Sequence, residues 1–127
     1  MKLEHVALQV ADPVAVAEWY KAHLAMRVVR TGDPPGNARF LADAKGASVL
    51  EIYAGPLPVP DYRAMDPLRL HVAFAPGDVT AARARLIAAG ATPLGEVAVT
   101  ATGDRFAMLR DPWGLALQLA QRARPLL

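Results

Sequence analysis

Apolar and polar residues alternate near the beginning of the chain. Val6, Leu8 and Val10 fall on one face of an extended segment, and the residues between them are polar or small. A period of two is the signature of a strand with one buried face, so we predict a strand over residues 3–10.

The pattern then changes to the period of a helix. Asp12-Pro13 suits a helix start, with Asp as the N-cap and Pro in the first turn. Val16, Tyr20 and Leu24 then share one face at helical spacing, which predicts a helix ending near residue 25. After it, glycine- and proline-rich turns separate three predicted strands, at about 26–31, 38–42 and 47–54.

The second half of the chain repeats the first. His71 in Leu70-His71-Val72 follows His5 in Glu4-His5-Val6 by 66 residues (71 − 5 = 66). The same element order is predicted at about 68–75 (strand), 78–89 (helix), 92–99, 104–110 and 115–121 (strands). The chain therefore predicts an α+β fold of two βαβββ modules, about 3–54 and 68–121, related by a pseudo-two-fold axis. Four prolines in residues 55–67 predict a stiff, extended linker.

Composition narrows the possible functions. A chain of 127 residues with 54% hydrophobic and 20% charged residues is typical of one folded domain spanning 1–127. The absence of cysteine excludes disulfides, thiolate metal sites and cysteine nucleophiles. The net charge of +2 comes from dispersed residues, so no nucleic-acid partner is expected. No segment resembles a membrane span or a signal peptide, and we expect a cytoplasmic protein.

Strand parity places polar donors on the faces that the helices do not cover. The aliphatic faces can pack on the helices, whereas the opposite faces of the first and last strand of each module carry His5, Glu51, His71 and Gln118. Their neighbours on those faces are mostly alanines, which leaves room for a cup-shaped ligand site. Two imidazoles, a carboxylate and an amide oxygen suit one divalent ion such as Zn, Ni, Fe or Mn.

Each of these residues also has a simpler interpretation. A single histidine on a strand is more often hydrogen-bonded core or surface than a ligand. Glu51 could lie on an exposed sheet face beside Arg39, and Gln118 could be a satisfied core amide. The equivalent positions of His5 and His71 in a repeated module favour the metal site, and so does the free-energy cost of an unpaired carboxylate inside a sheet.

Three further residues are candidates for contact with a substrate. Arg39 and Arg105 occupy equivalent positions in the two modules and could hold an anionic group, although such arginines more often form salt bridges. Tyr53 shares a strand face with Glu51 and could line the site or simply pack.

These motifs resemble the vicinal oxygen chelate superfamily, which includes glyoxalase I, extradiol dioxygenases and bleomycin-resistance proteins. The resemblance covers about residues 3–120 and depends on Leu3-Glu4-His5-Val6, Leu50-Glu51-Ile52, Leu70-His71-Val72 and Asp111-Pro112-Trp113-Gly114 followed by Leu117-Gln118-Leu119. It implies one divalent metal held by His5, Glu51, His71 and Gln118. In glyoxalase I the position of Gln118 commonly carries a carboxylate that acts as base, so the resemblance leaves Glu51 as the candidate ligand and base.

Three functions are compatible with these residues and motifs. The first is a metal-dependent lyase, isomerase or dioxygenase that stabilises an oxyanion on a small chelating substrate. The second is a metal-free protein that sequesters a small molecule in the same cup, as bleomycin-resistance proteins do. The third is a subunit whose site has decayed. Each is compatible with a homodimer, which relatives often form.

Overall fold

The computed structural model of the chain describes residues 1–126. It divides into two compact units, Met1–Pro60 and a second unit that begins at Asp61. The boundary falls within the predicted linker, and each unit contains one of the two predicted modules.

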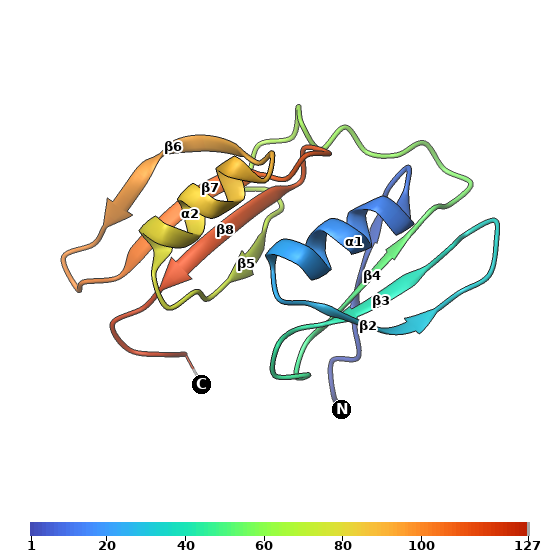
Figure 1. Cartoon of the computed structure of the whole chain (residues 1–127), viewed down its shortest axis with the longest axis horizontal. Helices are drawn as coiled ribbons and strands as arrows, with labels where there is room; N and C mark the ends of the chain where they lie inside the picture. Colours follow the sequence, from blue (N-terminus) through green and yellow to red (C-terminus); the bar gives the residue numbers. More distant parts are fainter. Residues whose placement is uncertain (127) are drawn as a thin grey trace. The chain divides into compact units, whose positions relative to one another are not determined.

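The first unit has the predicted βαβββ order. Its elements are β1 (Val6–Gln9), α1 (Pro13–His23), β2 (Arg27–Thr31), β3 (Arg39–Ala42) and β4 (Val49–Tyr53) (Figure 1). The sheet order is β1-β4-β3-β2; β1 pairs with β4 in parallel, and the other pairs are antiparallel.

The second unit repeats this topology. Its elements are β5 (Val72–Phe74), α2 (Val79–Ala88), β6 (Thr92–Val99), β7 (Arg105–Arg110) and β8 (Ala116–Gln121), and its sheet order is β5-β8-β7-β6. The parallel pair is again formed by the first and last strands. The predicted α+β fold of two modules with mixed sheets is therefore confirmed.

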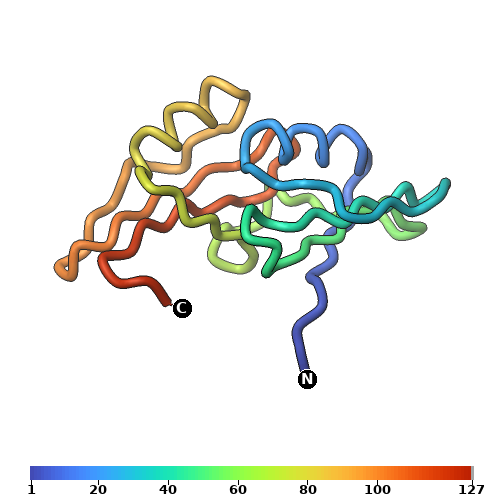
Figure 2. Tube along the Cα trace, turned by 60° about the horizontal axis from the view of Figure 1, so that its bottom comes forward, coloured from blue at the N-terminus to red at the C-terminus, as the bar shows by residue number. Residues whose placement is uncertain are grey.

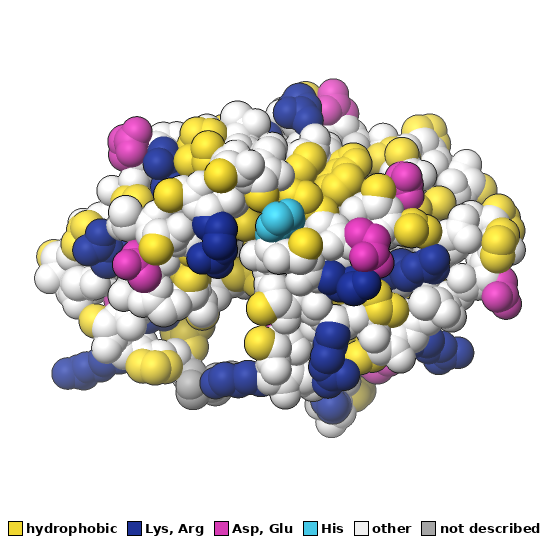
Figure 3. Space-filling model, viewed as in Figure 1, with side chains coloured by type: hydrophobic (Ala, Val, Ile, Leu, Met, Phe, Trp, Pro, Cys, Tyr) yellow, Lys and Arg dark blue, Asp and Glu magenta, His cyan; other side chains and the backbone are white. Residues whose placement is uncertain are grey.

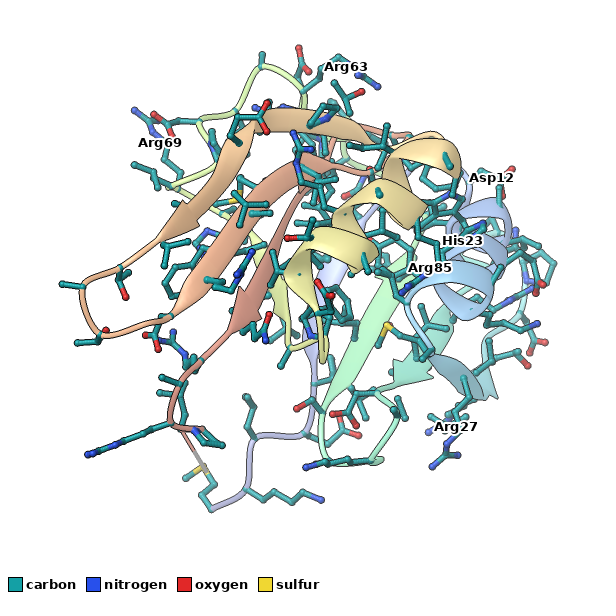
Figure 4. The ribbon with its side chains drawn as sticks, turned by 60° about the vertical axis from the view of Figure 1, so that its left-hand side comes forward. Asp12, His23, Arg27, Arg63, Arg69 and Arg85 are labelled. Carbon is teal, nitrogen blue, oxygen red and sulfur yellow. The ribbon has the colours of Figure 1, made fainter. Side chains whose placement is uncertain are left out.

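Both helices begin at the predicted aspartates. The Oδ1 atom of Asp12 accepts a hydrogen bond from the Ala15 amide at 3.0 Å, and that of Asp78 accepts one from the Ala81 amide at 3.0 Å. Each carboxylate satisfies an amide that the first helical turn leaves unpaired. Asp12 is labelled at the start of its helix in Figure 4.

One face of each sheet is buried beneath its own helix. In the first unit Leu8, Leu41 and Ile52 are at most 4% exposed, and Val16 and Tyr20 of α1 are equally buried. In the second unit the same core positions are taken by Leu109, Leu117 and Leu119 of the sheet and by Val79 and Leu86 of α2. Figure 2 shows each helix on one side of its own strands, as the alternating pattern predicts.

Two details of the predicted elements were wrong. The first strands of the modules are shorter than predicted, so His5 and His71 each lie immediately before a strand that begins at Val6 or Val72. The linker is not extended throughout, because the Met65 amide donates to the Asp61 carbonyl at 3.2 Å and the Arg69 amide to the Asp66 carbonyl at 3.0 Å. Asp61 and Asp66 also cap these turns with their side chains, which favours turns over an extended segment.

The predicted turn at Asp111-Pro112-Trp113-Gly114 is tightly fixed. Asp111 is 2% exposed, and its Oδ1 accepts the amides of Trp113 at 2.9 Å and Leu115 at 3.0 Å. Gly114 has φ +100°, which only glycine adopts without strain, and a Cβ atom there would lie 3.0 Å from the Arg63 backbone nitrogen.

We therefore expect Gly114→Ala to destabilise the protein by about 2–3 kcal/mol, because it combines backbone strain with a steric clash. Urea denaturation would measure the change in the free energy of unfolding. Gly77→Ala is the matched control, since nothing lies within 4 Å of a Cβ at Gly77. Equal stabilities for the two variants would contradict this explanation.

Candidate functional site

The face of the first sheet that α1 does not cover carries Glu51. Glu51 pairs in register with Ala7 of β1 and Phe40 of β3, so these three residues form a row on the face opposite Leu8 and Ile52. Ala7 is exposed, whereas Phe40 and Glu51 are half-buried. The face predicted from strand parity is confirmed in this unit, and it places a carboxylate beside a small residue and an aromatic ring.

His5 and Glu51 contact each other on this face. The Nε2 atom of His5 lies 3.1 Å from Oε2 of Glu51, and their side chains are 32% and 22% exposed. Glu51 therefore pairs with His5, and the interpretation that placed it beside Arg39 is wrong. The other ring nitrogen of His5, Nδ1, contacts the carboxylate of Glu4.

The imidazole of His5 thus lies between two carboxylates. The hydrogen bond with Glu4 is the main cause that raises the pKa of His5 above its usual value; desolvation opposes it, and the charges of Glu4 and Glu51 add to it. A metal ion needs the neutral imidazole, so metal binding at His5 should strengthen as the pH rises through this raised pKa.

The separation of His5 and Glu51 fits a shared metal ion. Imidazole nitrogens and carboxylate oxygens bind Zn²⁺ at about 2.0–2.2 Å, so two such ligands of one tetrahedral ion lie roughly 3.3 Å apart. The distance of 3.1 Å between the two atoms is close to that value. Half-exposed side chains also leave access for solvent and ligand.

His71 has the hydrogen bond that a metal-ligating histidine needs. Its Nδ1 atom lies 2.9 Å from the Pro67 carbonyl oxygen. A carbonyl can only accept, so Nδ1 carries the proton and Nε2 has the lone pair. Such a hydrogen bond fixes the tautomer and the orientation of a ligating imidazole.

The register places Gln118 relative to His71 as it places Glu51 relative to His5. Gln118 pairs with Ala73, two residues after His71, and Glu51 pairs with Ala7, two residues after His5. Gln118 is half-buried on the face opposite Leu117 and Leu119. The repeat seen in the sequence therefore extends to the placement of the donor pairs.

Each unit thus supplies two of the four predicted ligands. Within residues 1–126, no group of three or more His, Asp or Glu side chains is close enough to hold a metal ion. That the two pairs meet around one ion remains a prediction.

Arg39 and Arg105 lie on the helix-covered faces. Arg39 pairs in register with Ile52 and donates to the Asn37 and Ala38 carbonyls at 2.9 and 3.0 Å. Arg105 pairs with Gln121 and donates to the Thr80 hydroxyl of α2 at 3.0 Å. Both arginines therefore lie on the face opposite the predicted ligand of their sheet, and their contact with substrate remains a prediction.

Tyr53 shares the face of Glu51, as predicted. It pairs with Gln9, whose amide donates to the Leu57 carbonyl. Tyr53 is half-buried, and its contact with substrate also remains a prediction. The third histidine, His23, lies on α1 with its ring centroid 5.1 Å from that of Trp19, away from the donor pairs (Figure 4).

Two arginines have contacts that the sequence patterns did not indicate. Arg30 lies with its guanidinium carbon 5.9 Å from the centre of the Phe40 ring, on the face of Glu51. Arg110 donates to the carbonyls of Tyr62, Met65 and Gly114 at 2.8–3.0 Å. Elsewhere, on the face seen in Figure 3, Lys and Arg side chains are interspersed with Asp and Glu, as their positions along the chain indicate.

Comparisons with known proteins agree with this architecture. A model of the glyoxalase-like domain matches residues 5–120. The protein SMU.1112c is 32% identical, with 95% of this chain and 98% of that chain covered and a TM-score of 0.74. The E144Q mutant of glyoxalase I from Zea mays is 23% identical with a TM-score of 0.76, covering 97% of this chain but 46% of the maize chain.

An antibiotic-binding protein has the same fold. TnmS3 from Streptomyces sp. CB03234 is 22% identical, with 97% of this chain and 99% of that chain covered and a TM-score of 0.71. A search of curated protein sequences gave no match. In the part of the chain that the structure describes, neither helix has the length and apolar character needed to cross a bilayer.

Proposed function

The chain belongs to the glyoxalase-like domain family, and from this premise we propose that it is a metal-dependent enzyme acting on a small substrate that chelates through adjacent oxygens. The contact between His5 and Glu51 at 3.1 Å carries the proposal, because it brings two suitable ligands of a divalent ion together on an uncovered sheet face. His71, with its tautomer fixed by Pro67, and Gln118 would complete the ligand set.

The metal would act as a Lewis acid that stabilises an oxyanion formed on the substrate. Glu51 is the carboxylate of this set and would also take up a proton from the bound substrate. Its contact with His5 holds it on the uncovered face, where both roles need it. The alanines beside the ligands leave space for the substrate, and the reaction is a lyase, isomerase or dioxygenase step. We further expect a homodimer.

Metal analysis tests this proposal. After loading with Zn²⁺, Ni²⁺, Fe²⁺ or Mn²⁺ at pH 8, above the usual pKa of histidine, the protein should retain about one ion per chain. His5→Ala and His71→Ala should each weaken metal binding at least tenfold, because each removes a ligand. His23→Ala is the matched control and should bind metal normally. Equal metal content in all four proteins would overturn the proposal.

A metal-free binding protein is the second candidate. It is favoured by the observation that neither donor pair forms, among residues 1–126, a cluster of three or more His, Asp or Glu side chains. The similar fold of the antibiotic-binding protein TnmS3 adds support. Ligands of the native state raise the melting temperature, so a response to organic compounds but to none of the four metals would favour this candidate.

A further inference from the structure

A bulge in β2 places Arg30 on the uncovered face of the first sheet. Arg27 pairs with Ala42 and Val28 with Leu41, but the register then shifts so that Arg30 pairs with Phe40 instead of Arg39. The extra residue, Val29, reverses the alternation of faces along the strand. Arg30 therefore lies in the row that contains Phe40, Glu51 and Ala7.

Phe40 lies between Arg30 and His5 on this face. The guanidinium carbon of Arg30 lies 5.9 Å from the centre of the Phe40 ring, and the His5 ring meets the Phe40 ring edge-on with centroids 5.7 Å apart. A cation, an aromatic ring and the His5–Glu51 pair thus follow one another across the sheet.

Arg30 is exposed and has no carboxylate partner among residues 1–126. Arg122 of the second unit provides a contrast. It also lies over a phenylalanine, Phe106, with 5.3 Å between the guanidinium carbon and the ring centre, but it pairs with Asp104 at 3.4 Å. The charge of Arg122 is neutralised within the protein, whereas that of Arg30 is available to a ligand.

We propose that Arg30 binds a carboxylate group of the substrate, while Phe40 packs against the apolar part that joins this carboxylate to the chelating oxygens. This inference rests on the proposed function, since it takes the chelating oxygens to lie beside His5 and Glu51. A guanidinium suits the role because it can donate two parallel hydrogen bonds to a carboxylate.

The row also sets the length of the substrate. Neighbouring strands lie about 4.8 Å apart, so two strand spacings separate the backbone of Arg30 from that of Glu51 by about 10 Å. The substrate class is therefore a carboxylic acid whose chelating oxygens lie about 8–10 Å from its carboxylate, with a flat or apolar portion between them.

Two probes that differ only in charge test the inference. Titration of the zinc-loaded protein with 3,4-dihydroxycinnamate and with its methyl ester would measure both affinities, because both probes chelate through adjacent oxygens but only the acid is anionic. The native protein should bind the acid about tenfold more tightly than the ester, as expected for a charge-assisted hydrogen bond at an exposed site.

Variants of Arg30 then locate the source of this preference. Arg30→Ala should remove the preference and leave the affinity for the ester unchanged, whereas Arg30→Lys should retain part of it. Lys21→Ala removes one positive charge from α1 of the same unit and should leave the preference intact.

The outcomes separate this inference from the proposed function. Equal binding of acid and ester by the native protein, or a preference that survives in Arg30→Ala, would overturn the role of Arg30 and leave the metal site standing. A protein that takes up no zinc would overturn the proposed function and the inference with it.

Discussion

Replacing Gln118 by glutamate is expected to raise the affinity of the protein for a divalent metal about a hundredfold, or roughly 2.7 kcal/mol. Gln118 occupies in the second sheet the register position that Glu51 occupies in the first. A neutral amide oxygen is a weaker ligand than a carboxylate, so the substitution adds a full negative charge beside the ion. Competition against a chromophoric chelator at pH 8 would measure the change.

A double variant provides the control for charge. Glu51→Gln alone should weaken metal binding, because it removes the carboxylate from the proposed set. Glu51→Gln combined with Gln118→Glu moves the carboxylate to the second unit without changing the net charge, and its affinity should return close to that of the native protein. An unchanged affinity in Gln118→Glu would show that position 118 does not contact the metal.

The same variant tests why the chain departs from glyoxalase I. Gln118 cannot accept a proton, so the proposed site leaves Glu51 to act as ligand and base together. With a carboxylate at each position, one can hold the metal while the other takes up the proton. An increase in turnover of a chelating substrate in Gln118→Glu would therefore accompany the tighter metal binding.

Local patterns in the sequence were sufficient to predict the elements and their faces. The alternation around Leu8 and Ile52 identified the buried face, and Asp12 and Asp78 marked both helix starts. These features depend on residues close together in the chain, and the 66-residue repeat allowed each half to support the other. The contact of His5 with Glu51 followed from the same parity argument.

Features that depend on register or on distant contacts could not be predicted in this way. The bulge at Val29 changes which face Arg30 occupies, and no residue at that position marks the shift. Arg39 could have been placed on the covered face, because it immediately precedes Phe40 in the same strand. Arg110 contacts carbonyls 48 and 45 residues earlier in the chain, and nothing local indicates these partners.

Replacing Arg110 by alanine is expected to destabilise the protein by about 3 kcal/mol. The guanidinium donates to the carbonyls of Tyr62 at 2.8 Å, Met65 at 2.9 Å and Gly114 at 3.0 Å. It thereby joins the segment at 61–67 to the turn that ends at Gly114. Hydrogen bonds from a charged donor contribute about 1.5–3 kcal/mol each, and water can compensate part of the loss at this half-buried site.

Urea denaturation would measure this loss, and two variants separate its causes. Arg110→Lys keeps the positive charge but cannot make all three hydrogen bonds, so it should recover less than half of the lost stability. Arg69→Ala removes an exposed arginine near the same segment and should change the free energy of unfolding by less than about 0.5 kcal/mol. A similarly small change in Arg110→Ala would contradict the assigned role.

Arg110 also connects the stability of the second unit to the proposed metal site. The segment that it holds includes Met65 and leads to Pro67, whose carbonyl accepts the Nδ1 proton of His71. If the segment loosens, His71 loses the hydrogen bond that fixes its tautomer and orientation. Arg110→Ala should therefore weaken metal binding about tenfold under conditions where the variant remains folded, whereas Gly114→Ala, which also strains the turn, leaves the bonds of Arg110 to Tyr62 and Met65 in place and should weaken it less. A loss of metal affinity that merely follows the loss of stability in both variants would show that Arg110 does not position His71.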